Sequence, residues 1–127
     1  KSGAVRHLSE LFATGASLSV DFVALVIRKC YGLGAQAMLS GSISSPSYML
    51  SWPSGEFGAM GLEGAIKLGF KKELDKESDP GKRQQLFDNL LAQQYEKGKA
   101  IEVATVLEID AVIEPIDTRK IIIAALN

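Results

Sequence analysis

Two glycines and their neighbours form the segment of this sequence that is best suited to chemistry. Gly32-Leu33-Gly34-Ala35-Gln36-Ala37 follows an apolar run and opens a short helical pattern. The first N–H groups of a helix have no intrahelical partner, and the helix dipole favours negative charge beside them. The segment also fits G-x-G-x-x-G/A, the dinucleotide-binding pattern. It is therefore a candidate anion site built from backbone rather than side chains.

The dinucleotide interpretation is disfavoured by the surrounding residues. The helix that follows has room for only about two turns before Gly41, and residues 28–31 separate the apolar run from the first glycine. Glu56 lies at roughly the distance at which the pattern expects a ribose contact, but it follows Pro53 and is not at a strand end. Backbone N–H groups that face another oxyanion, and a purely structural turn, both remain open interpretations.

Few other side chains could take part in catalysis. His7 is the only histidine, so a surface or packing role is favoured over a catalytic triad or a zinc site. Cys30, the only cysteine, has no neighbouring base and is expected to be a packed thiol. Glu56 and Glu63 could form an acid–base pair, although their glycine-rich surroundings favour hydrogen bonds to backbone N–H groups. Trp52 is favoured as a packing anchor.

Composition excludes several classes of function. The chain has 127 residues, enough for one modest domain, and a formal net charge of -1. That balance gives no attraction to nucleic acid or to an anionic membrane. The apolar runs at residues 22–27 and 121–126 are too short to span a bilayer, and no secretion signal is visible. A single cysteine cannot form an intrachain disulfide, so we expect a cytoplasmic setting, or the mitochondrial matrix in a eukaryote.

Strand and helix patterns alternate along the chain and predict an α/β layered domain. The apolar run at 20–27 does not alternate, which predicts a central strand covered on both faces. Residues 71–81 are charged and predict a solvated loop, and Asp117 is a suitable N-cap for a last helix at 118–126. The other expected helices are 4–12, ending at Gly15, and 35–39, 61–70, 82–97 and 100–106; the other expected strands are 48–52, 56–60 and 111–113.

Four stretches, taken together, resemble a known family. They are residues 27–38, residues 51–65, the charged helical segment up to Tyr95, and residues 109–119. The most specific is Trp52-Pro53-Ser54-Gly55-Glu56-Phe57-Gly58-Ala59-Met60-Gly61-Leu62-Glu63-Gly64-Ala65. In this order they resemble the carboxyltransferase subunit (beta chain) of biotin-dependent acyl-CoA carboxylases, such as propionyl-CoA carboxylase. The resemblance covers nearly the whole chain.

The resemblance implies a ClpP/crotonase-like fold, in which ββα units stack into a spiral. Subunits of this family have two such domains, and residues 1–127 correspond to part of the C-terminal, biotin-side domain. The N-terminal domain, which binds acyl-CoA, would be absent, so the fragment alone is expected to be inactive. Implied partners are acyl-CoA, a biotin carboxylase and a biotin carrier subunit or domain. The family assembles as a homo-hexamer, with sites where domains of different subunits meet.

The implied reaction moves a carboxyl group from carboxybiotin, on its carrier, to the α-carbon of an acyl-CoA. Biotin itself takes the α-proton in this family, so no protein base is required. By the resemblance, the backbone N–H groups of Leu33 and Gly34 stabilise the biotin oxyanion. Gln36 falls beside the acyl group, and Gly32 and Ala35 belong to the same substrate-binding segment. Leu33 stands where many members of the family have glycine. The resemblance therefore does not identify which acyl-CoA is carboxylated.

Two further interpretations stay open. One is a subunit of a biotin-dependent acyl-CoA decarboxylase, which transfers the carboxyl group towards biotin. The other is a catalytically silent crotonase-like domain that only assembles. The apolar stripe at residues 4–12 and the run at 121–126 are expected to be uncovered in this chain, which predicts a dimer or a larger species.

Overall fold

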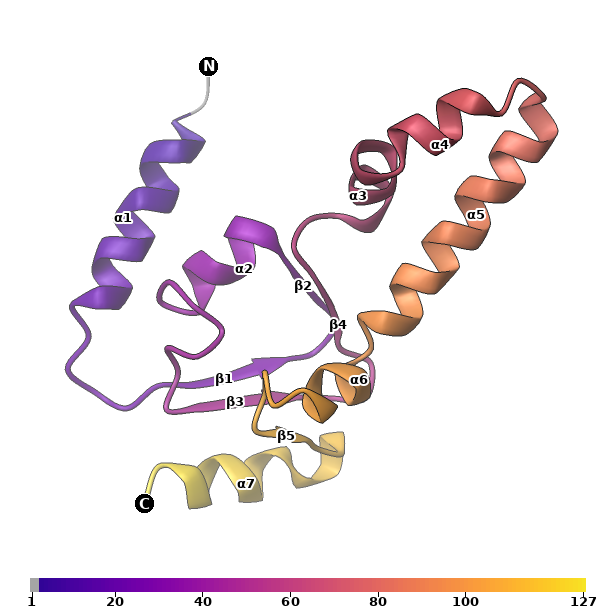
Figure 1. The fold of residues 1–127 in the computed structure, drawn as a ribbon. Coiled ribbons are helices and arrows are strands. Elements are labelled where there is room, and N and C mark those ends of the chain that lie inside the picture. The colour runs from indigo at the N-terminus through magenta and orange to yellow at the C-terminus, as the bar shows by residue number, and fades with distance from the viewer. Residues whose placement is uncertain (1–2) are drawn as a thin grey trace.

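The computed structural model describes residues 3–127, in which strands alternate with helices (Figure 1). In chain order the elements are α1 (Ala4–Ala16), β1 (Val23–Val26), β2 (Lys29–Tyr31), α2 (Gly32–Met38), β3 (Tyr48–Ser51), β4 (Glu56–Gly58), α3 (Leu62–Gly69), α4 (Lys71–Lys76), α5 (Pro80–Lys97), α6 (Ala100–Thr105), β5 (Ala111–Val112), the 3-10 helix η1 (Pro115–Asp117) and α7 (Thr118–Ala125). The alternation confirms the α/β class.

Two strand–strand–helix units follow one another, β1-β2-α2 and then β3-β4-α3. Equivalent strands of the two units pair in parallel: β1 pairs with β3, and β2 pairs with β4. β5 adds to β3, so one sheet has the order β1-β3-β5 and the other has the order β2-β4. Each unit thus contributes one strand to each sheet before its helix begins. This arrangement is the stacked ββα spiral that the resemblance implies.

The apolar core lies where the two sheets, α2 and α6 meet. Phe57 of β4 is 7% exposed and Ala100, the first residue of α6, is fully buried. Backbone hydrogen bonds join the same elements, since Phe57 N–H donates to Gly98 O at 2.8 Å and Ala100 N–H donates to Gly55 O at 3.0 Å. The buried cluster consists of Ala24, Val26, Leu39, Met49, Phe57, Ala100, Val103 and Ile109.

The prediction of one central, doubly covered strand at residues 20–27 is wrong. Within the described residues, the strand is only Val23–Val26, and it lies at the edge of its sheet because β3 is its sole partner. Its side chains alternate: Ala24 and Val26 are buried, whereas Val23 and Leu25 are half-buried. The chain then changes direction at Ile27, which is 53% exposed, and enters β2 in the second sheet. A continuous apolar run does not reveal such a change of sheet.

The prediction of a solvated loop at residues 71–81 is also wrong. Most of it is α4, and Leu74 of that helix is buried at 5% exposure. Charged side chains occupy the other faces, where Asp75 forms ion pairs with Lys71 and with Arg83 of α5. One buried leucine per six residues is a weak periodic signal, and the charges on the exposed faces mask it.

Helix ends agree with the sequence only in part. Gly98 caps the end of α5, as predicted. At the start of that helix, Asp79 accepts a hydrogen bond from Lys82 N–H at 2.8 Å. Gly15 does not end α1, which continues to Ala16. α7 begins at Thr118 as predicted, but Asp117 makes no side-chain cap hydrogen bond because it is the last residue of η1.

The two terminal helices lie against the outside of the molecule (Figure 1). Neither α1 nor α7 contains a buried residue. Val5 of α1 is 79% exposed and Ile123 of α7 is 51% exposed. The expectation that these two apolar faces are uncovered is confirmed in part, because Leu8, Phe12, Ile121 and Ile122 are half-buried. The predicted oligomer stays a prediction. No helix among residues 3–127 combines the length and apolar character needed to cross a membrane.

Candidate functional site

The glycine turn joins β2 directly to α2. Tyr31 is the last residue of β2 and also the N-cap of α2, with extended backbone angles of φ -122° and ψ 130°. Gly32 then adopts φ +58°, a left-handed conformation that other residues rarely take. A Cβ at Gly32 would lie 3.0 Å from the carbonyl oxygen of Ala59. Only glycine fits here without strain, which accounts for the first glycine of the segment.

Leu33 and Gly34 are the second and third residues of α2. Their N–H groups fall in the first helical turn, where no intrahelical carbonyl is available. The N-cap residue Tyr31 makes no side-chain cap hydrogen bond to them. A Cβ at Gly34 would have no atom within 4 Å, so the space beside the Gly34 Cα is open. The geometry is that of an unused donor pair at a helix start.

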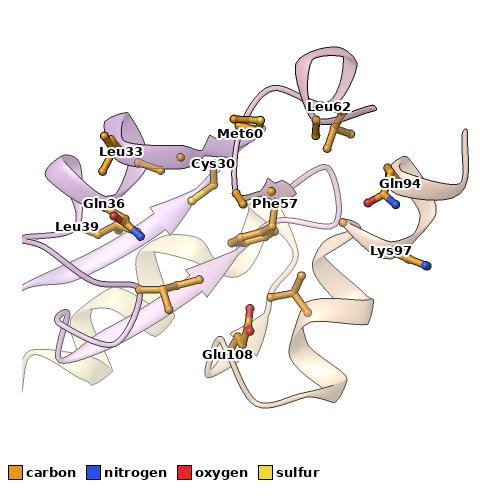
Figure 2. A pocket seen from close by; sticks show the side chains of 18 of the residues that line it. Cys30, Leu33, Gln36, Leu39, Phe57, Met60, Leu62, Gln94, Lys97 and Glu108 are labelled. Atoms are coloured by element: carbon orange, nitrogen blue, oxygen red, sulfur yellow. The ribbon is translucent and has the colours of Figure 1, made fainter. Parts of the chain in front are cut away.

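A cavity of about 670 Å³ lies beside this turn (Figure 2). It is lined by Gly32, Leu33, Ala35 and Gln36 of the predicted site, while Gly34 is not among its lining residues. Gly34 lines a neighbouring hollow of about 520 Å³, together with Ala35 and Tyr31. The five predicted residues, which are consecutive in the sequence, all lie in α2, and the two hollows divide them, with Ala35 lining both.

The large cavity is mostly apolar with a few polar groups. Figure 2 shows Phe57 at its centre next to Cys30, with Gln36 of α2 on one side and Glu108 on the other. Gln36 is exposed, so its amide is free to meet a ligand. The remaining labelled lining residues include Leu39, Met60, Leu62, Gln94 and Lys97. Such a mixture, apolar walls with few polar side chains, is typical of a small-molecule site.

Cys30 lies in the wall shared by both hollows. It is partly buried and packs against the core cluster, and burial raises the pKa of its thiol. A raised pKa leaves little thiolate near neutral pH, so the thiol is a poor nucleophile. The interpretation of Cys30 as a packed thiol agrees with this environment.

Tyr31 and Glu56 form a contact at the turn that the sequence does not reveal. The Tyr31 hydroxyl donates a hydrogen bond of 2.7 Å to Glu56 Oε2 across β2 and β4, in a partly buried position. Burial, followed by this hydrogen bond and the negative charge of Glu56, raises the pKa of Tyr31 far above its ordinary value. Glu56 therefore lies in a strand and accepts from a phenol. The prediction that it bonds backbone N–H groups is wrong.

The other candidates fall outside the turn. His7 is exposed on α1, where its Nδ1 lies 3.4 Å from Glu10 Oε2, which fits a surface role. Trp52 Nε1–H donates to Thr118 Oγ1 at 2.9 Å and so fastens α7 to the end of β3, which fits a packing role. Glu63 is in the first turn of α3. Within residues 3–127 no group of histidine, cysteine or acidic side chains could hold a metal ion.

One argument against a dinucleotide site has to be corrected. Residues 28–31 do not separate the strand from the first glycine, because β2 occupies Lys29–Tyr31 and runs straight into Gly32. The argument from helix length holds, since α2 ends at Met38 after about two turns.

Comparison with known proteins agrees with the fold described above. The model of the family described as carboxyl transferase domain matches residues 1–127. The propionyl-CoA carboxylase carboxyltransferase subunit of Haloferax mediterranei is 30% identical over 99% of this chain and 24% of its own length. The methylmalonyl-CoA decarboxylase subunit alpha of Veillonella parvula is 33% identical over 98% of this chain and 22% of its own. A solved single-chain, multi-domain long-chain acyl-CoA carboxylase superposes with a TM-score of 0.80 at 44% identity, over 98% of this chain and 12% of that one.

Proposed function

Because this chain belongs to the carboxyl transferase domain family, we propose that it is part of a carboxyltransferase acting between carboxybiotin and an acyl-CoA. The chain spans about a quarter of the length of the curated relatives it matches. The activity proposed is therefore that of a longer polypeptide. Within it, residues 1–127 would be part of the C-terminal, biotin-side domain, and the preceding domain would bind the acyl-CoA.

The observation that carries the proposal is the open first turn of α2. Leu33 and Gly34 present backbone N–H groups without side-chain caps beside two hollows. Carboxybiotin would supply the carboxyl group, and the N–H groups of Leu33 and Gly34 would face the negative charge left on the ureido oxygen. Donors that are already aligned with a developing oxyanion stabilise it without reorganisation, and the partial positive charge at a helix start adds to the effect. Gln36, on the exposed face of the same helix, would contact the acyl group.

The lining residues fit such a ligand. The compact bicyclic ring of biotin needs apolar walls and one or two donors for its ureido oxygen. Phe57, Leu39 and Met60 supply apolar surface in the larger cavity, where Leu33 supplies a donor, and Gly34 supplies a donor at the neighbouring hollow. Burial raises the pKa of Cys30, so its side chain in the cavity wall stays a thiol rather than a reactive thiolate. The chain thus needs no protein base or metal of its own for the role proposed.

Partners and assembly follow from the same proposal. We infer that the complete protein works with a biotin carboxylase and a biotin carrier, and that acyl-CoA is the acceptor. Sites in such a protein would form between domains of different copies, which suits the uncovered faces of α1 and α7. The Leu33 side chain, 65% exposed at the turn, would face the bound biotin and narrow its pocket.

Carboxyl transfer measured with the complete protein tests this function. A carrier bearing radiolabelled carboxybiotin is mixed with the protein and a series of acyl-CoAs from acetyl to long-chain. The proposal expects label to appear in an acid-stable carboxyacyl-CoA. If the label is released only as bicarbonate at the uncatalysed rate with every acyl-CoA, the chain is a silent assembly domain instead.

The decarboxylase direction is a second candidate, because a methylmalonyl-CoA decarboxylase subunit resembles this chain as well as the carboxylase subunit does. The same donors serve both directions, since the oxyanion is the same. The reverse assay supplies a labelled carboxyacyl-CoA and an uncarboxylated carrier. Transfer to the carrier that is faster than the forward reaction at matched saturation assigns the decarboxylase role.

A further inference from the structure

The contact between Tyr31 and Glu56 lies one residue before the open turn, outside the residues proposed to touch the substrates. We propose that Tyr31 and Glu56 are a positioning pair that sets the direction of the Leu33 and Gly34 amides. This inference rests on the proposed function, because it assigns a purpose to the same turn. The pair consists of the Tyr31 hydroxyl and Glu56 Oε2, separated by 2.7 Å.

On the β2 side the turn is held by this hydrogen bond and by the pairing of β2 with β4. β2 is a strand of three residues whose only sheet partner among the described residues is β4. The register places Tyr31 beside Gly58 and Lys29 beside Glu56, so the phenol reaches back two residues along β4 to its acceptor. Because Tyr31 is also the N-cap of α2, any rotation of Tyr31 about the strand would be passed to the first helical turn.

The ring of Tyr31 lies beside Gly58. A Cβ at Gly58 would lie 3.1 Å from Leu62 Cδ2, 3.2 Å from Met60 O and 3.3 Å from Tyr31 Cδ1, so the glycine leaves space that the ring shares with the segment leading into α3. On the other side of the turn, Gly32 approaches the carbonyl oxygen of Ala59 so closely that a Cβ would be 3.0 Å away. Two successive residues, Tyr31 and Gly32, are therefore close to β4 and to the segment after it.

β4 is itself held firmly, so it can serve as the reference for the turn. Phe57 of β4 is in the buried core. Its N–H donates to Gly98 O at 2.8 Å, and the backbone of Glu56 bridges to Lys99. The acceptor of the pair thus sits on a strand fastened at the junction of α5 and α6. An oxyanion site needs donors held to within about 0.5 Å of their productive place, and this chain of contacts supplies such a constraint.

The test compares variants of the complete protein that contains this chain. Tyr31→Phe keeps the ring over Gly58 and removes only the donor. We expect kcat for carboxyl transfer to fall about 10- to 100-fold, since a small misplacement of catalytic donors has effects of that order. KM for acyl-CoA should stay within about twofold, because the substrate contacts themselves are intact. Glu56→Gln, which keeps an acceptor oxygen, should retain most of the rate, whereas Glu56→Leu should match Tyr31→Phe.

Thr118→Val is the matched control, because it removes one partner of another partly buried side-chain hydrogen bond, that from Trp52 Nε1 at 2.9 Å. It should leave kcat near the wild-type value. A second readout is independent of activity: the amide ¹H–¹⁵N shifts of Leu33 and Gly34 should move in Tyr31→Phe and not in Thr118→Val.

Wild-type kcat and unmoved amide shifts in Tyr31→Phe would overturn the positioning role. Equal losses in Tyr31→Phe and Thr118→Val would do the same, since they would reveal a general loss of stability. A loss in Glu56→Gln as large as that in Glu56→Leu would indicate that the carboxylate acts on the substrate directly. A wild-type protein without carboxyl transfer would overturn the proposed function instead, and the amide shifts would still decide whether the pair orients the turn.

Discussion

Gly32 and Gly34 meet different requirements although they lie two residues apart. Gly32 has φ +58° and would bring a Cβ to 3.0 Å from Ala59 O, whereas a Cβ at Gly34 would meet no atom within 4 Å. A left-handed conformation costs roughly 1–2 kcal/mol for an L-residue with a side chain. Gly32 is therefore required by the fold, and Gly34 is open to the approach of a ligand.

Gly32→Ala should lower the free energy of unfolding by about 1–2 kcal/mol. Gly34→Ala should leave it unchanged or raise it by up to about 1 kcal/mol, because alanine is the better helix former. Urea denaturation of both variants measures the difference. Equal destabilisation by the two substitutions would contradict the backbone geometry assigned to the turn.

Gln36 is the residue of the site whose side chain should decide the choice of acyl group. It is exposed on α2 and lines the larger cavity. Gln36→Ile in the complete protein should change the ratio of kcat/KM between short and longer acyl-CoAs, because one or two methylenes are worth roughly 1–3 kcal/mol in such a pocket. Gln85→Ile, on an exposed face of α5, is the control. Unchanged ratios across acetyl-, propionyl- and butyryl-CoA would remove Gln36 from the site.

Site residues whose role depends on adjacent residues could be predicted from the sequence. Site residues whose role depends on a contact with a distant residue could not. The glycine spacing and the apolar run before it indicate Gly32, Leu33 and Gly34 as a turn that opens a helix. Tyr31 and Glu56 lie 25 positions apart, and only the pairing of β2 with β4 brings them together. A register of three residue pairs leaves no signature in the sequence. Gly58, which leaves room for Leu62, the Met60 carbonyl and the Tyr31 ring, is the sequence feature that comes closest to indicating this contact.

Among the helices and strands, α4 between α3 and α5 is a packed helix whose charged sequence predicts a solvated loop. Leu74 of α4 is buried at 5% exposure, whereas Leu68 of α3 is 69% exposed. Leu74→Ala should destabilise the chain by about 2–5 kcal/mol, the usual cost of truncating a buried leucine. Leu68→Ala, the matched control, should stay within about 0.5 kcal/mol of wild type. Thermal denaturation with matched baselines compares the two, and similar melting temperatures would show that α4 does not pack as described.

Element types could be predicted where a periodic pattern has clear ends. α5 has Asp79 and Pro80 at its start and Gly98 at its end, and the sequence predicts it to within two residues. The division of residues 20–31 between two sheets could not be predicted, because β1 and β2 are both short and lie next to each other in the chain. Which sheet a strand joins is decided by its partners, β3 and β4, and those lie much later in the chain.

At the scale of the whole molecule, apolar surface remains on the two terminal helices. Leu11 of α1 is 40% exposed and Leu126, beyond α7, is 51% exposed, and apolar surface that stays uncovered marks an interface. The isolated chain should therefore form a dimer or a larger species. Light scattering after gel filtration at tens of micromolar measures this. A clean monomer would contradict it, and the double variant Val5→Glu, Ile123→Glu should shift an oligomer towards monomer.

The central claim is that two backbone N–H groups of α2, rather than any side chain, stabilise the oxyanion. Replacing the residue 34 amide by an ester through semisynthesis deletes one donor and keeps the shape of the turn. In the complete protein, with saturating acyl-CoA and folding verified by circular dichroism, kcat for carboxyl transfer should fall about 100- to 1,000-fold, the cost of one oxyanion donor. Leu33→Ala, which keeps its N–H, should cost far less. An ester variant with near-normal kcat would contradict the backbone site and turn attention to Glu56 and Glu63.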